Sequence, residues 1–251
     1  MKPVSLIPLE KVPGHNMRIK YFDDYTLLSS HAAFIVQQEV ERKKDLLLCA
    51  ATGSSPLGLY RQLAAYSRNH PLFFDHIRLL KLDEWVGIPM SSHGSCEQYL
   101  REQLTGPLGI SSDRHHAFNS EAPSLEVECI RIQEVMDREG PIDVCILGLG
   151  KNGHLGFNEP GSSFTSHCHL ATLLETSKAH AMVHGYGEKP TLGMTIGIND
   201  ILSSKRILLI VSGKGKMNAK EMLFSGEVNA SCPATCLWTH DNVDCLILKE
   251  D

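Results

Sequence analysis

The stretch from Asp143 to Pro160 reads DVCILGLGKNGHLGFNEP, and it does more than any other part of the chain to determine the expected fold. An apolar run at 144–147 breaks into three closely spaced glycines. A buried strand that ends in a glycine-rich turn is typical of the carboxyl edge of a parallel sheet, where open α/β folds bind small ligands. The side chains that follow can exchange protons or form hydrogen bonds: Asn152, His154, Asn158 and Glu159. We therefore interpret this stretch as part of an active site, in which His154 and Glu159 form an acid/base pair.

The same alternation of apolar runs and amphipathic stretches extends through the rest of the chain. Strands are expected at 46–51, 77–82, 142–147, 194–198, 207–211 and 244–248. Helices are expected at 25–43, 57–67, 95–104, 125–138 and 214–224. This order predicts an α/β fold, a three-layer Rossmann-like sandwich whose mostly parallel sheet is covered by helices on both faces.

The chain contains no proline- or serine-rich linker and no repeat, so residues 1–251 are expected to form a single domain. The segment 161–189 has no clear periodicity and directly follows the proposed site. Long irregular segments beside active sites are often lids, and we expect one here.

The composition restricts the range of partners. The 251 residues carry a formal net charge of -5, whereas nucleic-acid binding normally needs a basic face. No stretch approaches the ~18 apolar residues that span a bilayer, and the first residues lack the apolar core of a signal peptide. We therefore expect a cytoplasmic protein with no nucleic acid or membrane partner. Its eight cysteines are expected to be free thiols.

Two strand-to-helix junctions have the composition of a phosphate site. The first is Thr52-Gly53-Ser54-Ser55-Pro56, where Ser55 is expected to cap a helix that begins at Pro56. Free amides at a helix N-terminus favour an anion, although an ordinary junction has the same composition. The second junction, at 212–216, reads SGKGK and adds lysines, Lys216 among them. A P-loop is excluded because no Gly-Lys-Ser/Thr follows the first junction.

Asp83 follows the expected strand at 77–82. A carboxylate at the carboxyl end of a strand, beside a phosphate site, is placed to act as a general base. An ordinary loop carboxylate is the alternative, and the sequence leaves both open.

Two other kinds of site have partial sequence support. Residues 148–153 satisfy the G-x-G-x-x-G template of dinucleotide folds, but Pro160 and the irregular stretch after it argue against the helix that this template needs. The pairs His180/His184 and Cys232/Cys236 match no zinc signature. We therefore expect neither a metal nor another cofactor. His115-His116 is expected to be an exposed loop pair, and Leu237-Trp238 is expected to be strand.

Taken together, these motifs resemble the glucosamine-6-phosphate deaminase/isomerase family over nearly the whole chain. The resemblance rests on TGSSP at 52–56, LDEW at 82–85, GKNGHLGFNEP at 150–160 and GKGK at 213–216. The related 6-phosphogluconolactonases share the Gly-His core but lack the Phe-Asn-Glu-Pro continuation. The sequences at 83–86 and 168–169 are most similar to the galactosamine-6-phosphate branch.

The resemblance implies a role for each residue. Asp83 would remove the proton at C2 of the sugar, and His154 would move protons during ring opening, assisted by Glu159. Asn152 belongs to the same catalytic group, at a position where many members have Asp. The phosphate would be held by Thr52, Gly53, Ser54, Ser55 and Lys216. An arginine that binds phosphate from the lid in many members is absent here, and Lys178, His180 and His184 are its candidate replacements.

The function expected from this resemblance is conversion of a 2-amino-2-deoxyhexose 6-phosphate to a ketose 6-phosphate and ammonia. Galactosamine 6-phosphate is the favoured substrate and glucosamine 6-phosphate the next. The alternatives are a 6-phosphogluconolactonase-type hydrolase and a non-catalytic sugar-phosphate sensor. The only expected partner is a small sugar phosphate, for a monomer or a small homo-oligomer.

Overall fold

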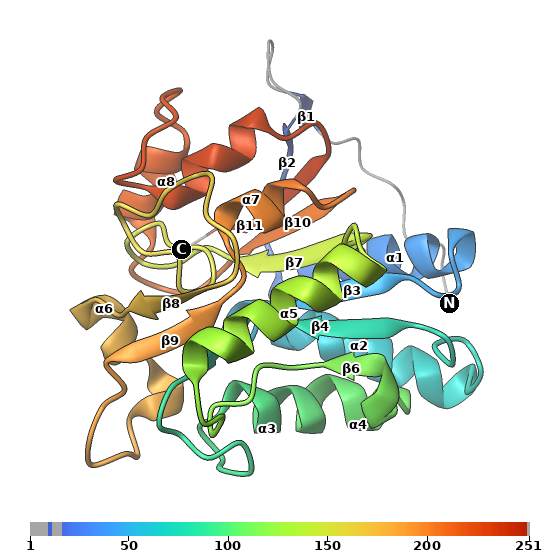
Figure 1. Ribbon diagram of the computed structural model, residues 1–251. Helices are drawn as coiled ribbons and strands as arrows, with labels where there is room; N and C mark the ends of the chain where they lie inside the picture. Colours follow the sequence, from blue (N-terminus) through green and yellow to red (C-terminus); the bar gives the residue numbers. More distant parts are fainter. Residues whose placement is uncertain (1–9, 12–16, 250–251) are drawn as a thin grey trace.

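The computed structural model describes residues 10–11 and 17–249 (Figure 1). Its strands are β1 (Glu10–Lys11), β2 (Met17–Phe22), β3 (Leu47–Ala50), β4 (Arg78–Lys81), β5 (Asp83–Trp85), β6 (His115–His116), β7 (Val144–Gly148), β8 (His169–Thr172), β9 (Leu192–Thr195), β10 (Ile207–Val211) and β11 (Val243–Leu248). Its α-helices are α1 (Tyr25–Arg42), α2 (Ser54–Asn69), α3 (Cys96–Leu100), α4 (Gly106–Leu108), α5 (Leu125–Glu139), α6 (Glu175–Lys178), α7 (Ile198–Leu202) and α8 (Met217–Leu223). A π-helical turn, η1 (Arg101–Thr105), joins α3 to α4, and short 3-10 turns lie at η2 (Ser112–Arg114), η3 (Ala181–Val183) and η4 (Pro233–Thr239).

The main sheet has the strand order β1-β2-β11-β10-β7-β3-β4-β6. Every neighbouring pair from β2 to β6 is parallel, and only β1 at the edge runs antiparallel. The prediction of a mostly parallel sheet is therefore confirmed.

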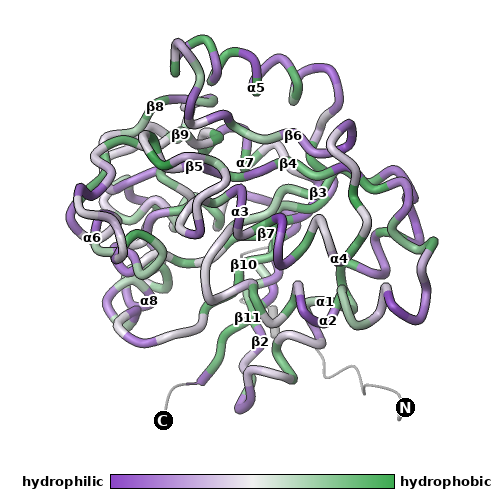
Figure 2. The backbone as a smooth tube through the Cα atoms, turned by 90° about the horizontal axis from the view of Figure 1, so that it is seen from below, coloured by the Kyte–Doolittle hydropathy of each residue, from purple (hydrophilic) through white to green (hydrophobic). Residues whose placement is uncertain are grey.

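Helices cover both faces of this sheet, because successive strand side chains point to opposite sides. Leu47 and Cys49 of β3 pack with α5, α7 and α8, whereas Leu48 and Ala50 pack with α1 and α2. Figure 2 shows the hydrophobic residues concentrated in the central strands β3, β7 and β10. The predicted three-layer arrangement is thus also confirmed.

The strand expected at 194–198 is wrong in extent and in partners. Strand β9 ends at Thr195 and belongs to a separate antiparallel sheet of order β5-β9-β8. Helix α7 begins immediately afterwards, because the Asp200 carboxylate accepts a hydrogen bond from the Gly197 amide at 2.9 Å and caps the helix.

Four other elements differ from the expectation. Strand β2, which pairs in parallel with β11, was not predicted. The helix expected at 95–104 continues as η1 and α4, and α8 begins only at Met217 because Gly213 and Gly215 hold the preceding loop in a positive-φ conformation. Leu237-Trp238 lies in the 3-10 turn η4 and is not a strand.

The segment 161–189, predicted to be an irregular lid, contains β8, α6 and η3. Strand β8 pairs with β9, so this part of the segment belongs to the small sheet. Its remainder supplies Ser177, His180 and His184 to the site described below.

His115-His116 is not an exposed loop pair. Both residues form β6, and their side chains are only 9% and 14% exposed. His116 Nε2 lies 2.8 Å from the Glu139 carboxylate on α5, and His115 Nδ1 lies 3.6 Å from Glu97. Each histidine thus has an acidic partner distant along the chain, which explains the difference.

All eight cysteines are free thiols, and seven of them are buried. Within the described ranges no helix has the length and apolar character needed to cross a bilayer.

Candidate active site

Four turns meet at one edge of the main sheet. They follow β3, β4, β7 and β10, which are neighbours in the strand order, so their carboxyl ends lie side by side. The turns and the segment 161–189 enclose a cavity of about 350 Å³. This volume lies within the ~300–1,000 Å³ range typical of small-ligand sites.

The turn after β3 leads into the N-terminus of α2. Gly53 precedes the helix with φ +101°, a conformation that favours glycine, and the first amides of α2 have no partner within the helix. These amides and the positive end of the helix dipole favour an anion. The expected start at Pro56 is wrong, because α2 already begins at Ser54.

Ser55 does not cap this helix, contrary to the prediction. Its Oγ lies 3.0 Å from Lys216 Nζ and 3.3 Å from Ser212 Oγ. Ser55 therefore links the turn after β3 to the turn after β10. Lys216 brings a positive charge to the N-terminus of α2.

Two tyrosines hold the start of α2 in place. The Tyr25 hydroxyl donates to the Ser54 carbonyl at 2.7 Å, and the Tyr99 hydroxyl donates to the Gly53 carbonyl at 2.6 Å. The backbone of this turn is therefore fixed from two other helical segments before any ligand is bound.

Asp83 lines the cavity at the start of β5 and is only 7% exposed. Burial raises the pKa of Asp83 to about 7; the neighbouring Glu84 charge adds to the rise, while Lys81 and the Cys96 thiol oppose it. Its Oδ1 atom accepts no hydrogen bond from any described residue. A carboxylate of this kind can take up or release a proton near neutral pH.

His154 lines the same cavity and is supported from behind by Glu159 and Asn152. His154 Nδ1 lies 3.5 Å from Glu159 Oε2, and the Asn152 amide donates to the same oxygen at 2.9 Å. Burial alone would raise the pKa of Glu159, but hydrogen bonds from His154, Ser177 and Asn152 lower it to about 2. Glu159 is therefore ionised near neutral pH, and its carboxylate lies beside the His154 ring.

Gly150 leaves room for the imidazole of His154 beside the turn after β7. A Cβ at this position would lie within 2.3–2.5 Å of three ring atoms of His154. Any larger residue at 150 would therefore displace the imidazole.

The structure gathers most of the predicted site residues and adds several that the sequence did not single out. The predicted residues that line the cavity are Thr52, Gly53, Ser54, Ser55, Asp83, His154 and Lys216, whereas Asn152 and Glu159 lie behind His154. Two of the lid candidates, His180 and His184, also line it, and so do four residues that the sequence did not single out: Trp85, Lys151, Ser177 and Lys214. Most of these added residues lie outside strand-to-helix junctions, and no periodic pattern identified them.

The two other kinds of site find no support in this geometry. Residues 150–153 form a turn, so the helix required by a dinucleotide template does not begin at Gly153. No group of three or more potential metal ligands occurs among residues 10–11 and 17–249.

Comparisons with known proteins agree with this architecture. Residues 26–246 match the family described as glucosamine-6-phosphate isomerases/6-phosphogluconolactonase. The chain is 37% identical to AgaI of Escherichia coli (strain K12), with 91% of each chain covered. It is 38% identical to glucosamine-6-phosphate deaminase 1 of Bacillus subtilis (strain 168), over 93% of this chain and 98% of the relative.

Solved structures give the same result. A monomeric glucosamine-6-phosphate deaminase of the NagB superfamily superposes with a TM-score of 0.89 at 38% identity, over 92% of this chain and 97% of that one. A 6-phosphogluconolactonase from Thermotoga maritima has a TM-score of 0.73 at 19% identity, over 93% of this chain and 100% of that one, and shares the fold. The chain therefore belongs to the family of glucosamine-6-phosphate isomerases and 6-phosphogluconolactonases.

Proposed function

We propose that the protein isomerises and deaminates a 2-amino-2-deoxyhexose 6-phosphate, giving a ketose 6-phosphate and ammonia. The observation that carries the proposal is one cavity lined by an anion cradle, a buried carboxylate and an imidazole. The named deaminase relatives, at 36–38% identity, support the same reaction. Galactosamine 6-phosphate is the favoured substrate because 83–86 and 168–169 resemble that branch.

Asp83 has the properties that the isomerisation step needs. Ring opening creates an aldehyde at C1, which makes the proton at C2 acidic. Asp83 takes this proton and the bonding electrons form a C1=C2 double bond, giving an enolamine. Return of a proton to C1 produces an imine at C2. A carboxyl group with a pKa of about 7 can perform both transfers.

His154 is the group proposed to open the pyranose ring. It moves a proton between the C1 hydroxyl and the ring oxygen, while the ionised Glu159 stabilises the charged imidazole. Water then adds to the imine at C2 and ammonia leaves, so the overall change is the addition of one water and the loss of one ammonia. The reaction needs no oxidant or reductant.

Lys216 and Ser55 are proposed to bind the 6-phosphate together with the first amides of α2. Binding a remote dianion orients the reacting carbons toward Asp83 and His154. Replacing Lys216 with alanine removes the ammonium at 3.0 Å from Ser55. We expect KM to rise at least about tenfold with kcat changed less than about threefold, measured by steady-state ammonia release. An unchanged KM would place the phosphate elsewhere.

His180 is the best replacement for the missing lid arginine. Its Nδ1 accepts the Met182 amide at 3.3 Å, so in the neutral ring Nε2 carries the hydrogen. That Nε2 lies 3.7 Å from where a Cβ on Gly53 would be, so it faces the start of α2. Burial, and then the charges of His154 and Lys216, lower the pKa of His180 to about 4, so it is a neutral donor before an anion binds.

The other two candidates are already engaged. His184 Nε2 lies 2.8 Å from the Ala179 carbonyl, so it carries the hydrogen there and leaves Nδ1 as an acceptor. Lys178 pairs with Glu175 at 2.8 Å and does not line the cavity.

We expect the substitution His180→Ala to weaken binding of inorganic phosphate about fivefold or more, because it removes one hydrogen-bond donor to an anion. Isothermal titration calorimetry of inorganic phosphate measures this without turnover. Lys178→Ala is the matched control and should bind as the parent does. Equal affinity of the His180 variant and the parent would contradict the assignment.

The reaction class is tested by following ammonia release from galactosamine 6-phosphate and glucosamine 6-phosphate in parallel. The epimers differ at one hydroxyl, which a few contacts can discriminate. We expect both to be deaminated, with the larger kcat/KM for the galacto epimer. Hydrolysis of 6-phosphogluconolactone without ammonia release from either amino sugar would replace this proposal with the lactonase, and phosphate binding without turnover would replace it with a sensor.

A further inference from the structure

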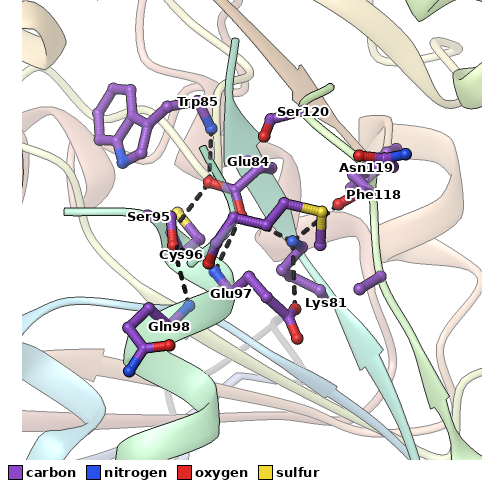
Figure 3. Close-up of polar contacts among 12 residues, drawn as sticks. Lys81, Glu84, Trp85, Ser95, Cys96, Glu97, Gln98, Phe118, Asn119 and Ser120 are labelled. Atoms are coloured by element: carbon purple, nitrogen blue, oxygen red, sulfur yellow. Dashed lines mark hydrogen bonds and ion pairs between the residues drawn. The ribbon is translucent and has the colours of Figure 1, made fainter. Parts of the chain in front are cut away.

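Directly behind Asp83 lies a group of charged side chains that does not face the cavity. Lys81 and Glu84 are completely buried, Glu97 is 4% exposed, and Lys81 Nζ lies 2.7 Å from Glu84 Oε2 (Figure 3). Among the described residues, those lining the cavity include Asp83 but none of these three. A buried ion pair is often no more stable than an apolar pair of similar volume, so stability alone does not account for it.

Glu84 joins the base-bearing strand to the start of α3. Its Oε1 accepts the amides of Trp85 and Cys96, each at 2.9 Å. Its Oε2 accepts the Glu97 amide at 2.8 Å as well as the Lys81 ammonium. Four hydrogen bonds thus fix this carboxylate, two of them to a helix N-terminus that favours a negative charge (Figure 3).

Lys81 is held on the other side by three acceptors. Its ammonium donates to Glu84 at 2.7 Å, to the Phe118 carbonyl at 2.9 Å and to Glu97 at 3.4 Å. Because an ammonium has three hydrogens, all of them are used. The Lys81–Glu84 pair is therefore held in a single geometry. Its two members flank the dipeptide Leu82-Asp83 in the sequence.

The other titratable groups that interact electrostatically with Asp83 are thiols and a phenol. They are Cys49 on β3, Tyr60 on α2 and Cys96 on α3, and burial raises the pKa of each well above its usual value. His154 lies across the cavity. The charged side chains that act most strongly on Asp83 are therefore those of Glu84 and Lys81.

We propose that Lys81 and Glu84 are positioning residues for Asp83, fixing the backbone on both sides of this residue and placing one positive and one negative charge beside its carboxylate. The proposal rests on the function assigned to Asp83 above. Asp83 Oδ1 has no hydrogen-bond partner among the described residues, so the affinity of this carboxylate for a proton depends mainly on burial and then on these two charges, with a smaller contribution from the Cys96 thiol. The two charges therefore shift the pH at which the base becomes active in opposite directions and largely balance each other.

The test is the pH dependence of kcat/KM for ammonia release. Activity needs ionised Asp83, so rates fall on the acidic side of its pKa. Lys81→Met removes the positive charge and should move the acidic limb upward by about half a pH unit or more; Glu84→Gln removes the negative charge and should move it downward by a similar amount. The double variant Lys81→Met/Glu84→Gln should return close to the parent midpoint.

Two further measurements separate this role from a structural one. Melting temperatures report the stability lost by each variant, and stability loss alone cannot produce shifts of opposite sign. Glu84→Asp keeps the charge but shortens the reach to the Cys96 and Glu97 amides, so kcat should fall at least about tenfold with the midpoint within about 0.3 pH unit of the parent. If a single variant does not fold, the double variant and Glu84→Asp still carry the test.

The proposal is overturned if the folded Lys81→Met and Glu84→Gln variants keep the parent midpoint or shift it in the same direction. It is also overturned if the midpoint of the double variant differs from that of the parent, or if Glu84→Asp shifts the midpoint. A Glu84→Asp variant with the same kcat as the parent would likewise overturn it. Absence of ammonia release from the parent protein itself would instead contradict the proposed function.

Discussion

Replacing Asp83 with asparagine is expected to lower kcat for ammonia release by about 10²–10⁴-fold while leaving sugar-phosphate binding within about threefold. Asparagine has nearly the same shape but cannot take the proton at C2, and the phosphate is proposed to be held elsewhere, by Lys216 and Ser55. Steady-state kinetics and calorimetry with a non-reacting hexitol 6-phosphate measure the two effects. Turnover within threefold of the parent would show that the base is another group.

The same substitution should stabilise the protein above neutral pH. The folded pKa of Asp83 is about 7, above the ~3.9 of an exposed aspartate, so the ionised form is disfavoured in the folded state. The resulting loss of stability grows as pH rises from about 4 to about 7 and is complete above that. At pH 8 the free energy of unfolding of the asparagine variant should therefore exceed that of the parent by on the order of 2–4 kcal/mol. Near pH 4 the two values should differ little.

Asp143 offers a matched control for both effects. It is also 7% exposed, but it is paired with Lys43 at 2.6 Å and Lys205 at 2.8 Å and does not line the cavity. Asp143→Asn should lose stability at neutral pH and keep near-parental kcat. If the Asp143 variant also gained stability, the gain in the Asp83 variant would be a general effect of introducing asparagine. It would then not show that ionised Asp83 destabilises the folded protein.

Replacing His154 with glutamine is the second large effect, with an expected fall in kcat of about 10²–10³-fold. Glutamine can form hydrogen bonds but cannot carry a proton between the C1 hydroxyl and the ring oxygen. Chemical quench of the first turnover measures whether ring opening has become slow. His167, which pairs with Asp200 at 2.7 Å outside the cavity, is the control, and His167→Gln should keep kcat. Parental kcat in the His154 variant would remove it from the mechanism.

The central strands could be predicted from sequence because they are buried on both faces. The runs at 46–51 and 144–147 are almost entirely apolar, which is typical of parallel strands between two helical layers. The motif at 150–160 could also be recognised from the sequence, because close contacts such as that of Gly150 with the His154 ring require its glycines.

The differences arise where contacts distant along the chain determine the structure. Strand β9 leaves the main sheet because it pairs with β5 and β8, and no local pattern shows that pairing. His116 is partly buried because its Nε2 atom forms a hydrogen bond with the carboxylate of Glu139, 23 residues away along the chain. His180 reaches the cavity from a segment without periodicity, so only the fold reveals its position. Lys81 and Glu84 look like ordinary surface charges until the fold buries them together.

The most direct test of the account follows deuterium placed at C2 of galactosamine 6-phosphate. Abstraction of this atom by Asp83 predicts that the parent protein releases one ammonia for each ketose 6-phosphate formed and that part of the deuterium appears in water, because a proton held by a carboxyl group can exchange before it returns to C1. The Asp83→Asn variant should do neither at a comparable rate. Transfer of all the deuterium to C1 in every turnover, or loss of ammonia with deuterium still at C2, would contradict the account.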